Sequence, residues 1–183
     1  PKSTSPRDSP WDMAESVKAA PLPDGGTIGI AAASSPFENR SEIDRGVRWY
    51  EERGYRVKLA PHVYARDDFV AGDAAARAAD VTALFADDDV DVVQTLRGGY
   101  GASQVVPLLD YDVIAASPKP FVGYSDVTAL HVAIRQRTGL VTFYGLGLTS
   151  MGAPKREEWD KERFLRGMTA TEALGEVPAR PDD

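Results

Sequence analysis

The sequence contains no cysteine among its 183 residues and only two histidines. Disulfide bridges, thiolate metal sites and a thiol nucleophile are therefore excluded, so any chemistry must use hydroxyl groups, carboxylates and imidazoles. No apolar run approaches the roughly 20 residues of a membrane-spanning helix. Residues 1–20 also lack the apolar segment of a signal peptide. We therefore expect a cytoplasmic protein without a membrane partner.

Clustered positive charge is also missing. The chain has 21 lysines and arginines against 28 aspartates and glutamates, a net charge of −7, and its basic residues are scattered singly. Such a chain does not attract a phosphate backbone, so we expect no nucleic-acid partner. Three adjacent aspartates at residues 87–89 resemble a metal site, but no further ligand has suitable spacing. A solvated turn is the preferred interpretation, so we expect no metal at these residues.

Hydrophobic residues make up 43% of the chain. Their spacing along the sequence alternates between strand patterns and helix patterns. Short apolar runs predict five strands, at residues 27–33, 55–59, 90–96, 119–123 and 140–144. Helical patterns separate them, which implies right-handed crossovers. The prediction is an α/β domain of flavodoxin-like type, a parallel sheet with helices on both faces.

The two ends of the chain depart from this pattern. Residues 1–24 are rich in proline, serine and lysine, which predicts a loose or docked arm. The α/β domain is expected at residues 25–170. Residues 171–183 are rich in proline and charge, as is typical of a linker, and we expect them to lead toward a further domain.

The fourth predicted strand ends in a turn that suits catalysis. It passes through Gly123 and Ser125 directly into a helical pattern. A sharp turn of this kind exposes its serine and leaves the following amides free, as in a nucleophile elbow. The usual elbow has a second glycine where this chain has Val127, so an N-capping serine is the alternative interpretation.

Loops that follow parallel strands share the carboxyl edge of the sheet, where ligands bind. We therefore expect Ser34 and Ser35, the loop 97–101 and Ser125 to share one rim. The loop Arg97-Gly98-Gly99-Tyr100-Gly101 lacks the lysine and the spacing of a phosphate loop. It is either a tight turn, or a loop whose Gly98 or Gly99 amide joins the Asp126 amide as an oxyanion donor.

Four segments in this order resemble the LD-carboxypeptidase family of serine peptidases: Ser34-Ser35-Pro36, the loop 97–101, Pro118-Lys119-Pro120 and the elbow 123–128. The resemblance runs from about Asp24 to the end of the chain. It implies a Ser-His-Glu hydrolase that cleaves a C-terminal L,D-peptide bond of murein stem peptides, without metal or cofactor, usually as a homodimer.

Carried over residue by residue, the resemblance makes Ser125 the nucleophile and assigns the oxyanion hole to the amides of Asp126 and Gly99, with Gly98 as the neighbouring candidate. We expect the substrate-binding residues to be Arg97, Tyr100, Ser34 and Ser35. The partner is then a small peptide, and a homodimer is expected from the family.

The family places the histidine and glutamate of the triad in a C-terminal domain, so we expect this chain to lack them and to be nearly inactive by itself. His131 lies six residues beyond Ser125, about 9 Å along a helix, whereas a base must be within roughly 3 Å. His62 follows a strand expected at the outer edge. Two alternatives stay open: a microcin-immunity-type hydrolase of aminoacyl-nucleotide analogues, and a peptide-binding domain without turnover.

Overall fold

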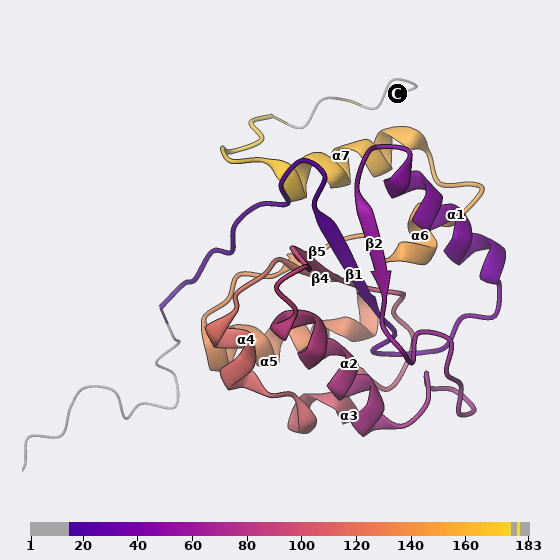
Figure 1. The fold of residues 1–183 in the computed structure, drawn as a ribbon, viewed down its shortest axis with the longest axis vertical. Coiled ribbons are helices and arrows are strands. Elements are labelled where there is room, and N and C mark those ends of the chain that lie inside the picture. Colours follow the sequence, from indigo (N-terminus) through magenta and orange to yellow (C-terminus); the bar gives the residue numbers. More distant parts are fainter. Residues whose placement is uncertain (1–14, 177–178, 180–183) are drawn as a thin grey trace, which may run out of the picture.

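The computed structural model describes residues 15–176 and 179, in which five parallel strands form one sheet between two layers of helices (Figure 1). The strands are β1 (Thr27–Ala31), β2 (Arg56–Leu59), β3 (Val92–Thr95), β4 (Phe121–Gly123) and β5 (Phe143–Tyr144). Their spatial order is β2-β1-β3-β4-β5, which is the flavodoxin-like order. The predicted fold class is confirmed.

Burial along the strands explains this order. Every residue of β1, β3 and β4 is buried, as expected of parallel strands covered on both faces. In β2, exposed residues alternate with partly buried ones, so the predicted outer position of this strand is confirmed. The predicted fifth strand, 140–144, is wrong at its start, because Leu140 forms a bridge with Val17 rather than joining β4.

Helices cover both faces of the sheet (Figure 1). One face carries α1 (Arg40–Glu51), α6 (Leu148–Gly152) and α7 (Glu158–Thr169), and the other carries α2 (Ala74–Ala86), α3 (Ala102–Val105), α4 (Tyr111–Ala116) and α5 (Thr128–Thr138). Two separate apolar clusters fill the two interfaces. The helix α3 is short and continues as the 3₁₀ helix η1 (Val106–Leu108), because Pro107 has no amide hydrogen to donate.

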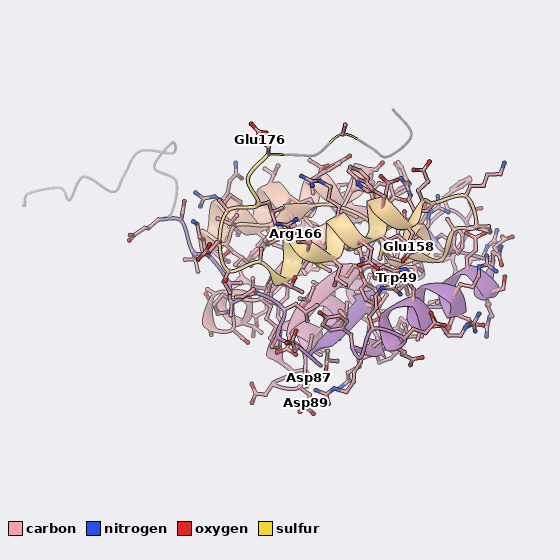
Figure 2. All side chains as sticks on the ribbon, turned by 90° about the horizontal axis from the view of Figure 1, so that it is seen from above. Trp49, Asp87, Asp89, Glu158, Arg166 and Glu176 are labelled. Atoms are coloured by element: carbon pink, nitrogen blue, oxygen red, sulfur yellow. The ribbon has the colours of Figure 1, made fainter. Side chains whose placement is uncertain are left out.

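Side-chain contacts fix the helix ends and the outer helices. Asp73 caps α2 by accepting from the amides of Ala75 at 2.8 Å and Ala76 at 3.2 Å. Figure 2 shows Trp49 of α1 facing Glu158 of α7, and the indole Nε1 donates to the carboxylate at 2.7 Å. In the acidic turn after α2, Asp87 accepts from the Asp89 amide at 3.0 Å.

The described part of the N-terminal segment packs on the domain. Val17 exchanges backbone hydrogen bonds with residues 139 and 141, and Leu22 is buried against the face that carries α1 and α7. Residues 1–14 and most of 177–183 lie outside the described residues, so the division into arm, domain and linker stays a prediction. Across 15–176 and 179, no helix has both the length and the apolar character to cross a bilayer.

Candidate active site

Three adjacent strands bring the expected site residues to one edge of the sheet. Hydrogen bonds join β1 to β3 and β3 to β4 in parallel, so the loops after these strands emerge side by side. These loops carry Ser34 and Ser35, the segment 97–101, and Ser125. The rim expected from the sequence therefore exists in the structure.

Ser125 lies in a sharp turn between β4 and α5. Its φ of +59° is one of two positive values among the described residues other than glycine, Asp68 being the second at +50°. A left-handed backbone costs such a residue on the order of 1–2 kcal/mol, and strain of this kind concentrates at functional sites. The N-cap positions of the 3₁₀ turn 125–127 and of α5 are held by Tyr124 and Val127, so the N-capping alternative for Ser125 is wrong.

Gly123 explains how the turn forms without a second glycine. A Cβ added at Gly123 would lie 2.5 Å from Cγ1 of Val127 and 2.7 Å from Oγ1 of Thr95. Val127 therefore packs directly on the glycine backbone, and it is fully buried. In this elbow, one glycine leaves room for the valine that occupies the position of the usual second glycine.

Hydrogen bonds from outside the turn hold its backbone. The Ser125 amide donates to the Tyr144 hydroxyl at 3.1 Å, and the Thr128 hydroxyl donates to the Ser125 carbonyl at 2.6 Å. Among the residues that the structure describes, the Ser125 hydroxyl itself has no hydrogen-bond partner. Sequence reasoning missed Tyr144, whose place beside the elbow follows from its pairing with Gly123 in the sheet.

Asp126, the residue after the serine, ties the three loops together. Its Oδ2 accepts from the Ser34 hydroxyl at 2.7 Å and from the Ala102 amide at 2.8 Å. Ser34 follows β1 and is fully buried, while Ala102 begins α3. The Asp126 carboxylate thus fixes the elbow against both neighbouring loops, and with it the backbone amide of the same residue.

The glycines at 98 and 99 allow the next loop to approach the serine. A Cβ added at Gly98 would lie 2.8 Å from the Ser125 Cβ, and one added at Gly99, whose φ is +127°, would lie 2.3 Å from the Ser35 Oγ. Within the described part of the chain, neither amide donates a hydrogen bond. The Ser35 hydroxyl accepts from the Tyr100 amide at 2.9 Å and donates to the Phe69 carbonyl at 2.8 Å.

Arg77 of α2 connects these loops through hydrogen bonds. Its guanidinium donates to the carbonyls of Ala33 at 3.0 Å, Gly101 at 2.8 Å and Gly72 at 3.1 Å, and to the Gln104 side chain at 2.7 Å. Burial lowers the pKa of this guanidinium, which stays charged because arginine does not deprotonate in proteins. Arg77 is a single arginine in an alanine-rich helix, and nothing in the surrounding sequence predicts this role.

Neither histidine contacts Ser125. His131 Nε2 lies 3.0 Å from the Gly123 carbonyl and its Nδ1 is buried without a partner. Burial lowers the pKa of His131, while the Gly123 hydrogen bond raises it by less. His62 lies beyond the edge strand β2 and its Nδ1 is 2.9 Å from the Asp80 carboxylate.

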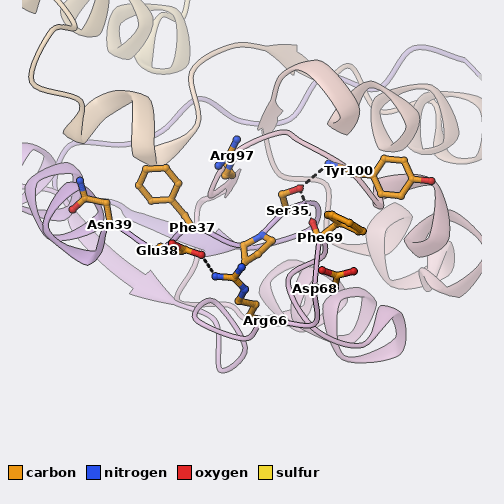
Figure 3. Close-up of a pocket in the computed structure, with 10 residues that line it drawn as sticks. Ser35, Phe37, Glu38, Asn39, Arg66, Asp68, Phe69, Arg97 and Tyr100 are labelled. Carbon is orange, nitrogen blue, oxygen red and sulfur yellow. Dashed lines mark hydrogen bonds and ion pairs between the residues drawn. The ribbon is translucent and has the colours of Figure 1, made fainter.

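A hollow of about 840 Å³ opens at the same edge of the sheet (Figure 3). It lies across the loops after β1, β2 and β3, and its lining comprises Ser35, Pro36, Phe37, Glu38, Asn39, Arg66, Asp68, Phe69, Arg97 and Tyr100. The Arg97 guanidinium stands 5.3 Å from the centre of the Phe37 ring, and its Nε donates to the Gly98 carbonyl at 3.1 Å. Three expected substrate-binding residues, Ser35, Arg97 and Tyr100, thus line a cavity of ligand size.

Residues 28–145, which include every segment of this rim, match the model of the LD-carboxypeptidase N-terminal domain. The chain belongs to the LD-carboxypeptidase family. It is 39% identical over 128 residues to the probable murein peptide carboxypeptidase of Bacillus subtilis, an alignment that covers 70% of this chain and 40% of that protein. The family resemblance expected from the motifs is confirmed.

The chain is also similar to a protein with a different name. The chain is 36% identical over 155 residues to the microcin C7 self-immunity protein MccF of Escherichia coli, covering 82% of this chain and 45% of MccF. The solved structure of MccF in complex with aspartyl sulfamoyl adenosine has a TM-score of 0.81 at 34% identity, covering 86% of this chain and 48% of that one. The chain therefore spans less than half the length of these relatives.

Proposed function

We propose that this chain is the nucleophile-bearing domain of a serine-type LD-carboxypeptidase that acts on murein peptides. The observation that carries the proposal is the strained Ser125, whose unpartnered hydroxyl stands at the carboxyl edge of the sheet against Gly98. Membership of the family and the similarity to a protein named as a murein peptide carboxypeptidase support it.

In the proposed mechanism, the Ser125 hydroxyl attacks the carbonyl carbon of the last peptide bond while a base takes its proton. The amides of Asp126 and Gly99, with Gly98 adjacent, donate to the oxyanion that forms. Losing one such donor costs roughly 3 kcal/mol of barrier. The amine of the terminal residue then leaves with the proton, and water hydrolyses the Ser125 ester.

The base is proposed to come from outside this chain. His131 is engaged beneath the elbow by the Gly123 carbonyl, and His62 is engaged by Asp80 beyond the edge strand. A serine without a base is a weak nucleophile at neutral pH. We therefore propose that a histidine and a glutamate of a C-terminal domain complete the site and that the isolated chain has little activity.

Arg97 is the proposed ligand of the substrate's terminal carboxylate. Its side chain lies beside Gly98 and forms no ion pair with any described residue. A guanidinium can bind a carboxylate through two parallel hydrogen bonds. Tyr100 lines the same hollow and is 64% exposed. Ser34 and Ser35 were expected to bind substrate, but their hydroxyl groups are engaged by Asp126 and Phe69, so we propose that they position the loops.

A second candidate function is hydrolysis of an aminoacyl-nucleotide analogue. It is favoured by the aromatic lining of the hollow, because Phe37 and Tyr100 offer surfaces on which a planar base stacks. The similarity to MccF, solved with aspartyl sulfamoyl adenosine, points the same way. The family also leads us to propose a homodimer, which sedimentation at several concentrations would test.

The decisive assay uses the longest native polypeptide that contains this sequence. We expect it to release D-alanine from a peptide that ends in an L-residue linked to D-alanine, and Ser125→Ala to lower kcat by at least about 10³-fold while peptide affinity changes little. Ser103→Ala, on the exposed side of α3, is the matched control.

Undiminished release by Ser125→Ala would contradict the proposal. Peptide binding without release would favour the binding-domain alternative. Faster hydrolysis of aspartyl sulfamoyl adenosine than of the peptide, compared as kcat/KM, would favour the second candidate function.

A further inference from the structure

The hydroxyl of Tyr144 is the partner of the backbone amide of Ser125. Its oxygen accepts from this amide at 3.1 Å, although the two residues are 19 positions apart in the sequence. Among the residues that the structure describes, this is the one hydrogen bond that the Ser125 amide makes. The 3₁₀ turn 125–127 begins at Ser125, and an amide at the start of a helix has no partner within that helix. A side chain from another strand therefore satisfies it.

The sheet and α5 support Tyr144 in this position. Tyr144 ends β5, where it pairs with Gly123 of β4. Its ring lies against the ring of His131 of α5, with 6.3 Å between the ring centroids, and the His131 ring packs edge-on against Phe121 at 5.2 Å. Phe121 is fully buried. Although Tyr144 is 71% exposed, contacts with a strand and a helix thus define where its hydroxyl lies.

Two side chains hold the two peptide groups that flank Ser125. Tyr144 accepts from the N–H of the peptide group before the Ser125 Cα, and the Thr128 hydroxyl donates to the carbonyl of the peptide group after it at 2.6 Å. The orientation of these two planar groups about the Cα defines φ and ψ. Holding both groups therefore keeps Ser125 at its φ of +59°, which is unfavourable for a serine by itself.

The two sides of Ser125 differ in the number of bonds that hold them. The Ser125 carbonyl accepts from the backbone amide of Thr128 as well as from its hydroxyl. The Ser125 amide has Tyr144 alone within the described part of the chain. Loss of the Thr128 hydroxyl would leave a backbone bond in place, whereas loss of the Tyr144 oxygen would leave none. The conformation of Ser125 therefore depends most on Tyr144.

We propose that Tyr144 is a positioning residue for the nucleophile. Its phenolic oxygen acts as an acceptor that holds the Ser125 amide, so that the Ser125 hydroxyl keeps the direction needed for attack and the Asp126 amide is left to the oxyanion. The inference rests on the proposed function in one respect, because Ser125 is the nucleophile in both. Its new element is Tyr144, and it applies to any electrophile that Ser125 attacks, whatever the natural substrate.

A fluorophosphonate tests the inference without a peptide substrate. The serine hydroxyl attacks the phosphorus and gives its proton to the base, fluoride leaves, and intact mass measures the adduct. In the longest native polypeptide that contains this sequence, Tyr144→Phe should lower the labelling rate of Ser125 by about tenfold or more, because a misplacement of about 1 Å can cost about 10²-fold. The kcat of D-alanine release should fall by a similar factor, with KM nearly unchanged.

O-Methyltyrosine at position 144 separates the acceptor from the donor. It keeps the phenolic oxygen but has no hydroxyl proton, so it should retain most of the labelling rate. In the ¹⁵N-labelled 183-residue chain, the Ser125 amide should exchange with solvent faster in Tyr144→Phe than in the parent or the O-methyltyrosine chain. Tyr111→Phe is the matched control. Its hydroxyl donates to the Val106 carbonyl at 2.6 Å, so this substitution should lower the melting temperature slightly and leave the labelling rate unchanged.

The outcomes separate this inference from the proposed function. Labelling that depends on Tyr144 in a protein that releases no D-alanine would support the inference and contradict the proposed substrate. Unchanged labelling and unchanged D-alanine release in Tyr144→Phe would overturn the inference alone. An O-methyltyrosine protein as impaired as Tyr144→Phe would also overturn it, because the proton rather than the oxygen would then carry the effect. A parent protein that is not labelled at Ser125 would overturn both.

Discussion

At the scale of single residues, the elbow depends on the absence of a side chain at Gly123. An added Cβ would be 2.5 Å from Val127 and 2.7 Å from Thr95, both of which are buried. Neither neighbour can move without displacing the core beneath the elbow. The same turn keeps Ser125 at positive φ, so the packing of Gly123 and the strain of the serine are coupled.

We predict that Gly123→Ala lowers the free energy of unfolding by roughly 1–3 kcal/mol, the usual cost of overpacking a core, as measured by urea denaturation. Gly167→Ala in α7 is the matched control, because the nearest atom to its added Cβ is 4.0 Å away. That substitution should stabilise the fold by up to about 1 kcal/mol. Equal effects of the two substitutions would contradict the packing argument.

His131 makes the stability of the elbow depend on pH. Burial lowers its pKa in the folded protein, so the unfolded chain binds the proton more tightly. The contribution of neutral His131 is complete above the unfolded pKa of about 6.5. It decreases as the pH falls through 6.5 toward the lowered pKa of the folded state.

Urea unfolding at pH 7.5 and pH 5.5 should therefore show a smaller loss of stability for His131→Gln than for the parent chain. Glutamine can still donate to the Gly123 carbonyl but does not titrate. The difference between the two proteins isolates His131 from His62 and the carboxylates. A parallel loss in both would show that His131 does not contribute.

At the scale of elements, Arg77 joins α2 to the loops after β1 and β3. Its guanidinium donates to four acceptors from four segments, and its side chain is 1% exposed. Asp126 likewise connects the elbow with the loop after β1 and with the start of α3. The relative positions of the loops thus depend on two charged side chains rather than on apolar packing alone.

We predict that Arg77→Lys lowers the free energy of unfolding by roughly 2–3 kcal/mol. A single ammonium cannot reach all four acceptors, and each buried acceptor that loses its donor carries a desolvation cost. Calorimetric unfolding measures the effect, and Arg166→Lys, an exposed position on α7, should leave the melting temperature nearly unchanged. An unchanged melting temperature for Arg77→Lys would contradict the assigned role.

At the scale of the whole molecule, the chain before β1 contributes to the core on the face of α1 and α7. Leu22 is 2% exposed, and its amide donates to the Met168 carbonyl at 2.9 Å. This contact joins segments near both ends of the described chain. It shows that part of the region predicted as an arm packs on the domain.

We predict that Leu22→Ala costs roughly 2–4 kcal/mol of stability, as expected for a buried leucine, in a denaturant titration. Val17→Ala should cost less than about 1 kcal/mol, because Val17 is 37% exposed. If Leu22→Ala were as mild as Val17→Ala, the segment before β1 would contribute little to the core.

Local sequence patterns were sufficient for the order of the elements and for the position of the elbow. The buried runs that became β1, β3 and β4 consist of apolar residues between turn signals, and Gly123 and Ser125 mark the strand-to-helix turn. Contacts between residues far apart in the sequence were not predicted. Ser34 was expected to contact substrate, yet its hydroxyl bonds Asp126, which is 92 residues away in the sequence.

The sequence by itself determined the α/β fold, the family and the candidate nucleophile, because periodicity, turn residues and short motifs are local properties. Only the tertiary structure decided that Tyr144 lies against the Ser125 amide, that Arg77 supports the rim, and that Arg97 and Asp68 face one hollow. These contacts join residues from different loops. No local pattern encodes which loops meet, since strand order and the packing of helices on the sheet bring them together.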